Sequence, residues 1–259
     1  MNSDVLILVT NDDGVLSPGL TVLADALKAV GQVVVVAPDR ERSAIGHSLT
    51  LHAPLRAEEI AEGFYAISGT PTDCVNLGIH GLLERTPDIV VSGINRGGNL
   101  GDDITYSGTV AAAMEATLMG VPAFAVSLES LSFTPDDFAL AARFAASIAG
   151  QIISHELPAD TFLNINVPSG EVSGVKLTRQ GKRRYAGEIE IKTDPRGKKY
   201  YWLGGSELGF HDVEGTDFNA INHHYISVTP LHMDLTNYRS FDEISTWDLD
   251  RCFTADEKP

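Results

Sequence analysis

The apolar residues of this chain gather in short, uninterrupted runs. Three of these runs lie in the first hundred residues: Val5–Val9, Val33–Ala37 and Ile89–Val91. Each is rich in valine and isoleucine and shows no alternation with polar residues. Such a run is typical of a strand that is buried on both faces of a parallel sheet covered by helices.

Stretches with apolar residues at helical spacing separate these runs. The first such stretch begins at Ser17-Pro18, an N-cap followed by proline, and Gly31 is placed to end it. Similar start signals recur at Thr70-Pro71 and at Ser107. Strands that alternate with helices in this way form βαβ units. The pattern therefore predicts an α/β fold, a three-layer Rossmann-like domain with a mostly parallel sheet.

The pattern continues to about residue 170 and then changes. We expect further strands at 64–67, 123–127 and 162–167, and a long helix capped by Thr134–Asp137. Beyond Gly170 the chain reads as mixed strands with a turn at Asp194–Gly197 and an aromatic segment, Tyr200–Leu203. We therefore predict a catalytic core over 1–170. We expect residues 171–259 to form a C-terminal extension, with a projecting hairpin and a return of the chain to the core, and not an independent domain.

The aromatic hairpin has two readings. Tyr200–Leu203 is too aromatic for a free tip, so the hairpin could be an oligomer contact in a β-rich arm. It could equally fold back on its own domain. The basic run Arg179–Arg184 is more typical of a solvated face.

Composition narrows the class of protein. The chain is 43% hydrophobic and 21% charged, as expected of a globular protein, and its net charge of -16 argues against binding to a nucleic acid polymer or an anionic membrane. Cys74 and Cys252 are far apart, which suits a reducing compartment. No secretory signal is evident, and no run approaches the ~20 apolar residues of a membrane span. We expect a cytoplasmic protein.

Oxygen-bearing side chains follow the three apolar runs. Asp12 and Asp13 come directly after the first, Ser43 lies beyond the second and Asn95 follows the third. The carboxyl ends of parallel strands meet at one edge of the sheet, where ligands bind. Adjacent carboxylates repel each other and gain from a shared cation. This set has hard oxygen donors and no cysteine or convincing histidine, which favours one Mg²⁺ or Mn²⁺ per subunit over Zn²⁺.

A glycine-rich loop supplies a place for an anion. Gly97, Gly98 and Gly101 permit close backbone approach, and Ser107-Gly108-Thr109 opens a helix. Backbone N–H groups at a helix N-terminus bind phosphate without lysine or arginine, and the Ser107 and Thr109 hydroxyls add donors. Each feature alone is weak: Asp-Gly is common turn chemistry, and the glycines match neither the dinucleotide nor the Walker pattern. Their convergence at one sheet edge predicts a site that holds a phosphoryl group for attack by water.

Six motifs together resemble one known family over nearly the whole chain. They are Thr10–Gly14, Ala37–Arg40 with Arg42-Ser43, Ser68–Asp73, Ser92–Asn95, Gly98–Gly101 through Tyr106–Ala111, and Ser227–Leu231. In combination they are specific for the SurE family, the metal-dependent survival-protein nucleotidases.

The resemblance implies a 5′-nucleotidase, a phosphatase that hydrolyses nucleoside 5′- and 3′-monophosphates to nucleoside and phosphate. It also implies some activity on short polyphosphate. It implies that Asp12, Asp13, Ser43 and Asn95 bind the divalent ion. It also implies that Asn99, Ser107, Gly108 and Thr109 line the phosphate, and that the protein is a homodimer or homotetramer assembled through its C-terminal arm.

The mechanism that we expect is direct attack by metal-activated water, with Asp12 as the catalytic carboxylate that orients or deprotonates it. An aspartyl-phosphate intermediate is the competing route. Two other function classes stay open: a non-catalytic nucleotide sensor and a metal-dependent sugar-nucleotide transferase. His47 and the pair His223-His224 are better explained as structural or exposed residues than as catalytic ones.

Overall fold

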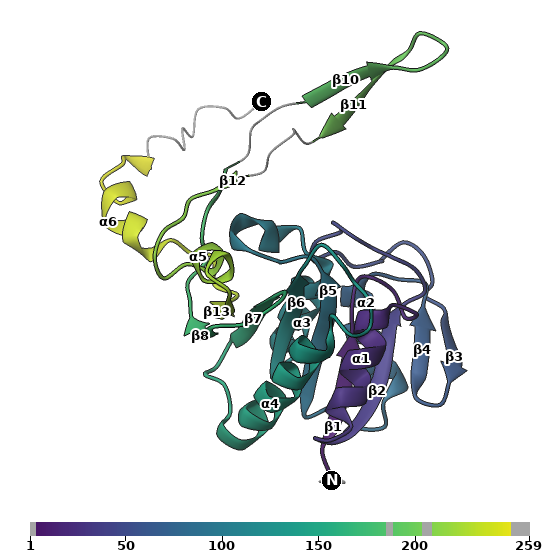
Figure 1. Ribbon diagram of the computed structural model, residues 1–259. Helices are drawn as coiled ribbons and strands as arrows, with labels where there is room; N and C mark the ends of the chain where they lie inside the picture. The colour runs from purple at the N-terminus through teal and green to yellow at the C-terminus, as the bar shows by residue number, and fades with distance from the viewer. Residues whose placement is uncertain (1–3, 185–188, 204–208, 250–259) are drawn as a thin grey trace, which may run out of the picture.

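The fold is organised around one nine-stranded sheet. The computed structural model describes residues 4–184, 189–203 and 209–249 (Figure 1). In spatial order the strands are β3 (Ala57–Ala61), β4 (Phe64–Ile67), β2 (Gln32–Pro38), β1 (Leu6–Thr10), β5 (Ile89–Arg96), β6 (Ala123–Glu129), β7 (Thr161–Pro168), β13 (Tyr225–His232) and β8 (Gly174–Leu177). The β3–β4 and β7–β13 pairs are antiparallel, and the other pairs are parallel. The sheet is therefore mostly parallel, as predicted.

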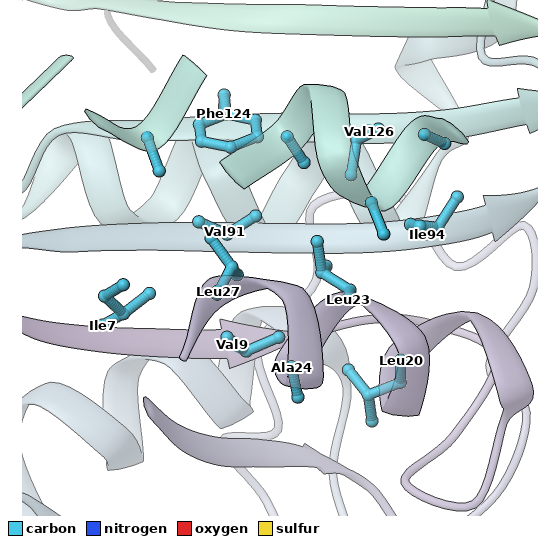
Figure 2. Close-up of a cluster of buried hydrophobic side chains, with 14 of the residues drawn as sticks. Ile7, Val9, Leu20, Leu23, Ala24, Leu27, Val91, Ile94, Phe124 and Val126 are labelled. Atoms are coloured by element: carbon cyan, nitrogen blue, oxygen red, sulfur yellow. The ribbon is translucent and has the colours of Figure 1, made fainter. Parts of the chain in front are cut away.

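Helices cover both faces of the sheet. Helices α1 (Pro18–Leu27) and α4 (Ala139–His155) pack on one face, and α2 (Pro71–Leu77) and α3 (Gly108–Leu118) pack on the other. Figure 2 shows the first of these layers, with α1 lying against β1 and β5. The predicted three-layer α/β architecture is confirmed.

Strand β1 shows why an uninterrupted apolar run was required. Ile7 and Val9 point into the layer of α1 and α4, whereas Leu6 and Leu8 point into the layer of α2 and α3. Full burial of a side chain of this size contributes roughly 1.5–3 kcal/mol. Side chains on both faces of the strand contribute this free energy, so the position of β1, and with it the position of the following turn, is strongly stabilised.

One local prediction differs from the structure, and one strand was not predicted. Thr134–Asp137 does not cap α4, because Asp137 accepts hydrogen bonds from the Thr134 backbone and hydroxyl (both 2.7 Å) and closes a separate turn. The helix begins only at Ala139. Strand β3 was not predicted, since it is an edge strand with all five residues exposed and no buried face to mark it.

The C-terminal segment returns to the sheet and also projects from it. Strands β8 and β13 lie beyond residue 170 yet belong to the central sheet, so the division at 170 stays a prediction. Short strands β9 (Arg183–Arg184) and β12 (Gly209–Phe210) pair at the base of the hairpin formed by β10 (Ile189–Thr193) and β11 (Lys199–Leu203). The turn at 194–197 joins β10 to β11 as predicted. Figure 1 shows this hairpin extending away from the core.

A π-helix (Gly78–Leu82) and a 3₁₀ helix (Gly101–Thr105) precede the hairpin in the chain. The remaining helices follow it. They are α5 (Asp217–Asn222), a 3₁₀ turn (Tyr238–Ser240) and α6 (Phe241–Ile244). No helix within the described ranges is both long enough and apolar enough to cross a bilayer. Cys74 is buried and carries a free thiol, whereas Cys252 lies outside the described residues.

Candidate metal and phosphate site

A tight turn after β1 fixes the two adjacent aspartates. The Asn11 side chain accepts a hydrogen bond from the Gly14 backbone N–H (3.2 Å) and donates to the Gly14 carbonyl oxygen (3.1 Å) and to Ser17 Oγ (2.7 Å). Ser17 in turn caps α1. Asn11 therefore links the turn to the start of the helix, so that Asp12 and Asp13 are presented in a fixed position. No local sequence pattern marks Asn11 for this role.

Asp12 faces the N-terminus of α3. Only 5% of the residue is exposed. Thr109 donates to its carboxylate through both the hydroxyl (2.5 Å) and the backbone N–H (3.2 Å). A Cβ atom on Gly108 would lie 2.9 Å from the Asp12 Cβ, so only glycine allows this close approach. The first turn of α3 thus both contacts the carboxylate and leaves its backbone N–H groups near it.

The charge on Asp12 is unfavourable without a cation. The pKa of Asp12 is raised to about 6, chiefly by burial; the hydrogen bonds from Thr109 oppose the rise and the negative charge of Asp13 adds to it. A buried carboxylate beside a second carboxylate gains free energy from any positive charge placed between them. This is the electrostatic environment in which a divalent ion is stabilised.

Asp13 is held by the residue that follows Asn95. Arg96 contacts it through the backbone N–H (3.2 Å) and through Nε (2.9 Å). The same guanidinium reaches Glu41 at 3.3 Å, and Ser43 donates its hydroxyl to Glu41 at 2.7 Å. This chain of contacts joins the loops after β1, β2 and β5.

The backbone brings the predicted ligands to the same edge. The Arg42 N–H donates to the Asp12 carbonyl oxygen at 2.7 Å, so Ser43 follows a residue that is bonded directly to the acidic turn. Asn95 donates its amide to the Gly97 carbonyl oxygen (2.8 Å). Because Asn95 Nδ2 is used in this way, its side-chain oxygen is the atom that would serve as a ligand.

The donor set fits a hard cation. Carboxylate, hydroxyl and amide oxygens are the atoms that Mg²⁺ and Mn²⁺ prefer. Among the described residues no group of three or more histidine, cysteine, aspartate or glutamate side chains could hold a metal, and the predicted set contains only two such residues. In the structure Asp13 and Ser43 bond to Arg96 and Glu41, two residues that the sequence analysis missed. The assignment of the four ligands stays a prediction.

The four residues predicted to line the phosphate have different surroundings. Ser107 caps α3 by accepting from the Val110 N–H (3.0 Å), which leaves its hydroxyl proton available, and Gly108 is the first residue of the helix. The Thr109 hydroxyl is bonded to Asp12. Asn99 donates its side-chain amide to Ser127 Oγ (2.8 Å). Ser107 and Gly108 are thus the most available of the four, and the phosphate role of all four stays a prediction.

His47 fastens the loop that contains Ser43. Its Nε2 lies 2.6 Å from Oε2 of Glu115, a buried residue of α3, and Asn76 donates to the other carboxylate oxygen at 3.2 Å. This contact accords with the structural role expected for His47. It ties the far part of the loop after β2 to the helix whose N-terminus faces Asp12.

The basic run is largely exposed, as expected for a solvated face, but two of its cations are paired with carboxylates. Lys182 bonds to Asp102 at 2.9 Å and Arg183 bonds to Asp103. Both partners lie in the loop between the glycines and Ser107, some eighty residues earlier in the chain. Local sequence patterns contain no signal for a pairing at this separation. The C-terminal segment is therefore attached to the loop that leads to the phosphate site.

Comparison with known proteins gives the family. The model of the family described as Survival protein SurE matches residues 7–187. The chain belongs to the SurE family. A protein named 5′-nucleotidase SurE from Syntrophotalea carbinolica is 64% identical over 245 residues, which cover 95% of this chain and 98% of that protein. The protein of the same name from Geobacter sulfurreducens is 62% identical over 249 residues, which cover 95% of each chain.

A solved structure of a SurE protein agrees with the fold. The crystal structure of the SurE protein from Aquifex aeolicus superposes with a TM-score of 0.83 at 47% sequence identity, covering 93% of this chain and 98% of that one. The similarity extends over the C-terminal segment as well as the core. The resemblance drawn from the six sequence motifs is confirmed.

Proposed function

We propose that this protein is a 5′-nucleotidase, a metal-dependent phosphatase that hydrolyses nucleoside monophosphates to nucleoside and phosphate. The observation that carries the proposal is the buried Asp12 carboxylate, which lies beside Asp13 and against the N-terminus of α3. This arrangement supports a cation site and an anion site next to each other. Relatives at 54–64% identity over most of the chain bear the name 5′-nucleotidase SurE.

Asp12, Asp13, Ser43 and Asn95 would hold one divalent ion, Mg²⁺ or Mn²⁺. Metal dependence is a general property of the family. When bound, such an ion polarises the phosphoryl group and lowers the pKa of water. Arg96 holds Asp13 in position through its backbone and its side chain, as the hydrogen-bonded neighbours of ligating carboxylates commonly do.

The chain's own groups bind and orient the phosphate. The Gly108 N–H and the Ser107 hydroxyl bind phosphate oxygens at the start of α3, where the helix dipole favours negative charge. Thr109 keeps the Asp12 carboxylate turned toward this position, so Asp12 orients or deprotonates the attacking water. Asn99, whose carbonyl oxygen accepts from the side-chain amides of Asn164 and Asn166, would also border the phosphate.

Phosphate release tests the function directly. We expect the protein to release phosphate from several nucleoside monophosphates with Mn²⁺ and to stop when EDTA is added. Asp12→Asn keeps the shape of the side chain and removes its charge, so the rate should fall at least ~100-fold. The matched control is Asp25→Asn, because Asp25 is an exposed residue of α1 that pairs with Lys28 on the surface of the helix.

The same assay separates the alternatives. Nucleotide binding without phosphate release would instead indicate a sensor, and product formation only with an added acceptor would indicate a sugar-nucleotide transferase. Rapid quenching with a labelled substrate distinguishes the two hydrolytic routes. A stable phosphoprotein would contradict attack by water and favour an aspartyl-phosphate.

A homo-oligomer assembled through the C-terminal segment belongs to the same proposal. The hairpin exposes Ile189, Ile191, Tyr201 and Trp202, and the segment around α6 exposes Phe241 and other large apolar side chains. Monomeric proteins rarely expose contiguous apolar patches of this kind. A dimer or tetramer would bury them.

The cytoplasmic location expected from the cysteine content also stays a proposal.

A further inference from the structure

A cleft of about 470 Å³ opens at the carboxyl edge of the sheet, between the core and the C-terminal segment. Small-molecule sites are commonly of this size and are lined by apolar surface with a few polar groups. The residues that matter here are Leu100, Glu129, Arg183, Phe210, Asn222 and His224. None of them belongs to the metal and phosphate site.

The cleft adjoins that site through the glycine-rich loop. Asn95 lies near the end of β5, just before this loop, and Leu100, which lines the cleft, lies near the end of the loop. Glu129 is the last residue of β6, the neighbour of β5. Pro168 is the last residue of β7, and Ser169 comes directly after it; all three line the cleft. Because neighbouring strands are ~4.8 Å apart, the cleft begins roughly 5–10 Å from the end of β5. A ribose joins a phosphate to a base across a gap of this order.

Glu129 lies where the ribose would be. Its Oε2 accepts a hydrogen bond from the Gly98 N–H at 2.5 Å, and a Cβ on Gly98 would lie only 2.7 Å from the same oxygen. The glycine therefore allows the carboxylate to lie directly on the loop. The residue is exposed and its second oxygen can accept hydrogen bonds from hydroxyl groups. An acidic side chain that accepts from ribose hydroxyls is the arrangement found in dinucleotide-binding folds.

The far end of the cleft offers an aromatic surface. Phe210 stacks on the buried Phe218 with ring centroids 5.0 Å apart and an interplanar angle of 5°. Arg183 lies over the Phe218 ring at 4.7 Å. Phe210 is half-buried and lines the cleft, while the exposed side chains of Asn222 and His224 supply polar groups beside it. A flat ring with polar groups at its border matches a nucleobase.

We propose that this cleft binds the nucleoside part of the substrate, with the ribose hydroxyls on Glu129 and the base against Phe210. Asn222 and His224 contact the edge of the base. The inference rests on the proposed nucleotidase function, because it assigns the phosphate end of the same molecule to Ser107 and Gly108. It gives the C-terminal segment a direct part in choosing the substrate.

A series of three substrates tests each contact separately. They are a nucleoside 5′-monophosphate, its 2′,3′-dideoxy analogue and ribose 5-phosphate. Phe210→Ala should lower the ratio of kcat/KM for the nucleotide to that for ribose 5-phosphate by at least about fivefold, the lower end of what base stacking contributes. Glu129→Ala should lower the ratio for the nucleotide against the dideoxy analogue. Because both readouts are ratios, a general loss from a displaced Gly98 cancels.

Control variants and a binding measurement complete the experiment. Leu118→Ala and Glu58→Gln alter exposed residues away from the cleft and should leave both ratios unchanged. Titration with adenosine, which has no phosphate, should show binding to the wild type and at least about fivefold weaker binding to Phe210→Ala. Asn222→Ala, at the exposed end of α5, should weaken adenosine binding without removing the aromatic stack.

The outcomes distinguish this inference from the proposed function. Unchanged ratios in both cleft variants, or equal adenosine affinity in wild type and Phe210→Ala, would overturn the cleft assignment while nucleotide hydrolysis stood. Absence of phosphate release from every nucleotide by the wild type would overturn the function instead. Adenosine binding would still decide the cleft in that case.

Discussion

Substitution of Asp217 examines how the C-terminal segment is joined to the loop before the phosphate site. The residue is 1% exposed. Its Oδ2 accepts the Gly101 N–H (2.7 Å), and its Oδ1 accepts the N–H groups of Gly181 and Phe218 (2.8 Å each). Asp217→Asn keeps one oxygen for the last two bonds but turns an NH₂ group toward the Gly101 N–H. Asp217→Ala removes all three acceptors.

The expected losses differ between the two variants. A buried N–H without an acceptor costs about 1–3 kcal/mol. Burial also raises the pKa of Asp217, so the ionised carboxylate is itself unfavourable, and both variants remove that cost. Water can enter the space left by alanine and satisfy part of the N–H groups. We therefore expect the free energy of unfolding to fall by about 1 kcal/mol in Asp217→Asn and by about 3 kcal/mol in Asp217→Ala.

Urea unfolding and amide hydrogen exchange measure these losses. Exchange should quicken at the Gly101 amide in both variants, but at the Gly181 amide only in Asp217→Ala. The phosphate-release rate should fall with the loss of order in the loop. If Gly101 stayed protected in Asp217→Asn, or if both variants unfolded at the wild-type urea concentration, the carboxylate would not be the link between the two segments.

Three further changes have definite expected results. Burial raises the pKa of Asp217, so the stabilising contribution of this group is fully present below its unfolded-state pKa of about 3.9 and is lost as pH rises through its folded-state pKa. In urea titrations, the free energy of unfolding of the wild type should therefore rise relative to that of Asp217→Asn between pH 7 and pH 4. Parallel pH profiles would contradict this. His47→Ala removes the contact to one oxygen of the buried Glu115 carboxylate, whose other oxygen accepts from Asn76, so the free energy of unfolding should fall by roughly 1–3 kcal/mol and Mn²⁺ binding, followed by calorimetry, should weaken. His47→Gln should recover part of both, and wild-type values in His47→Ala would refute the fastening role. Ile191 and Tyr201 are paired across the hairpin. The double variant Ile191→Asp with Tyr201→Asp should lower the mass measured by light scattering to that of a monomer. An unchanged oligomer would rule out the hairpin as its interface.

The sequence predicted the elements that depend on local pattern and on burial. Val5–Val9 could be assigned because a strand buried on both faces has no room for polar residues. The prediction that Asp12, Ser43 and Asn95 lie at one edge of the sheet rests on parallel strands, whose carboxyl ends share an edge. These inferences needed only the order of the strands, and the sheet has β2, β1 and β5 as neighbours.

The contacts within the site were beyond such reasoning. Arg96 on Asp13 and Thr109 on Asp12 pair residues more than eighty positions apart, and no periodicity marks them. The attachment of Arg183 to Asp103 was missed for the same reason, because a basic run looks alike whether it is solvated or paired. The start of α4 was misplaced because the side chain of Asp137 completes a turn with the signature of a helix cap.

Hydrolysis by the proposed route requires that one divalent ion is bound by the four oxygen-bearing side chains at the ends of β1, β2 and β5. The most direct test is anomalous diffraction at the manganese edge from crystals grown with Mn²⁺. We expect one peak per chain, roughly 2.0–2.4 Å from oxygens of Asp12, Asp13, Ser43 and Asn95. A peak elsewhere, or no peak between these side chains in crystals of an enzyme that Mn²⁺ activates, would contradict the account.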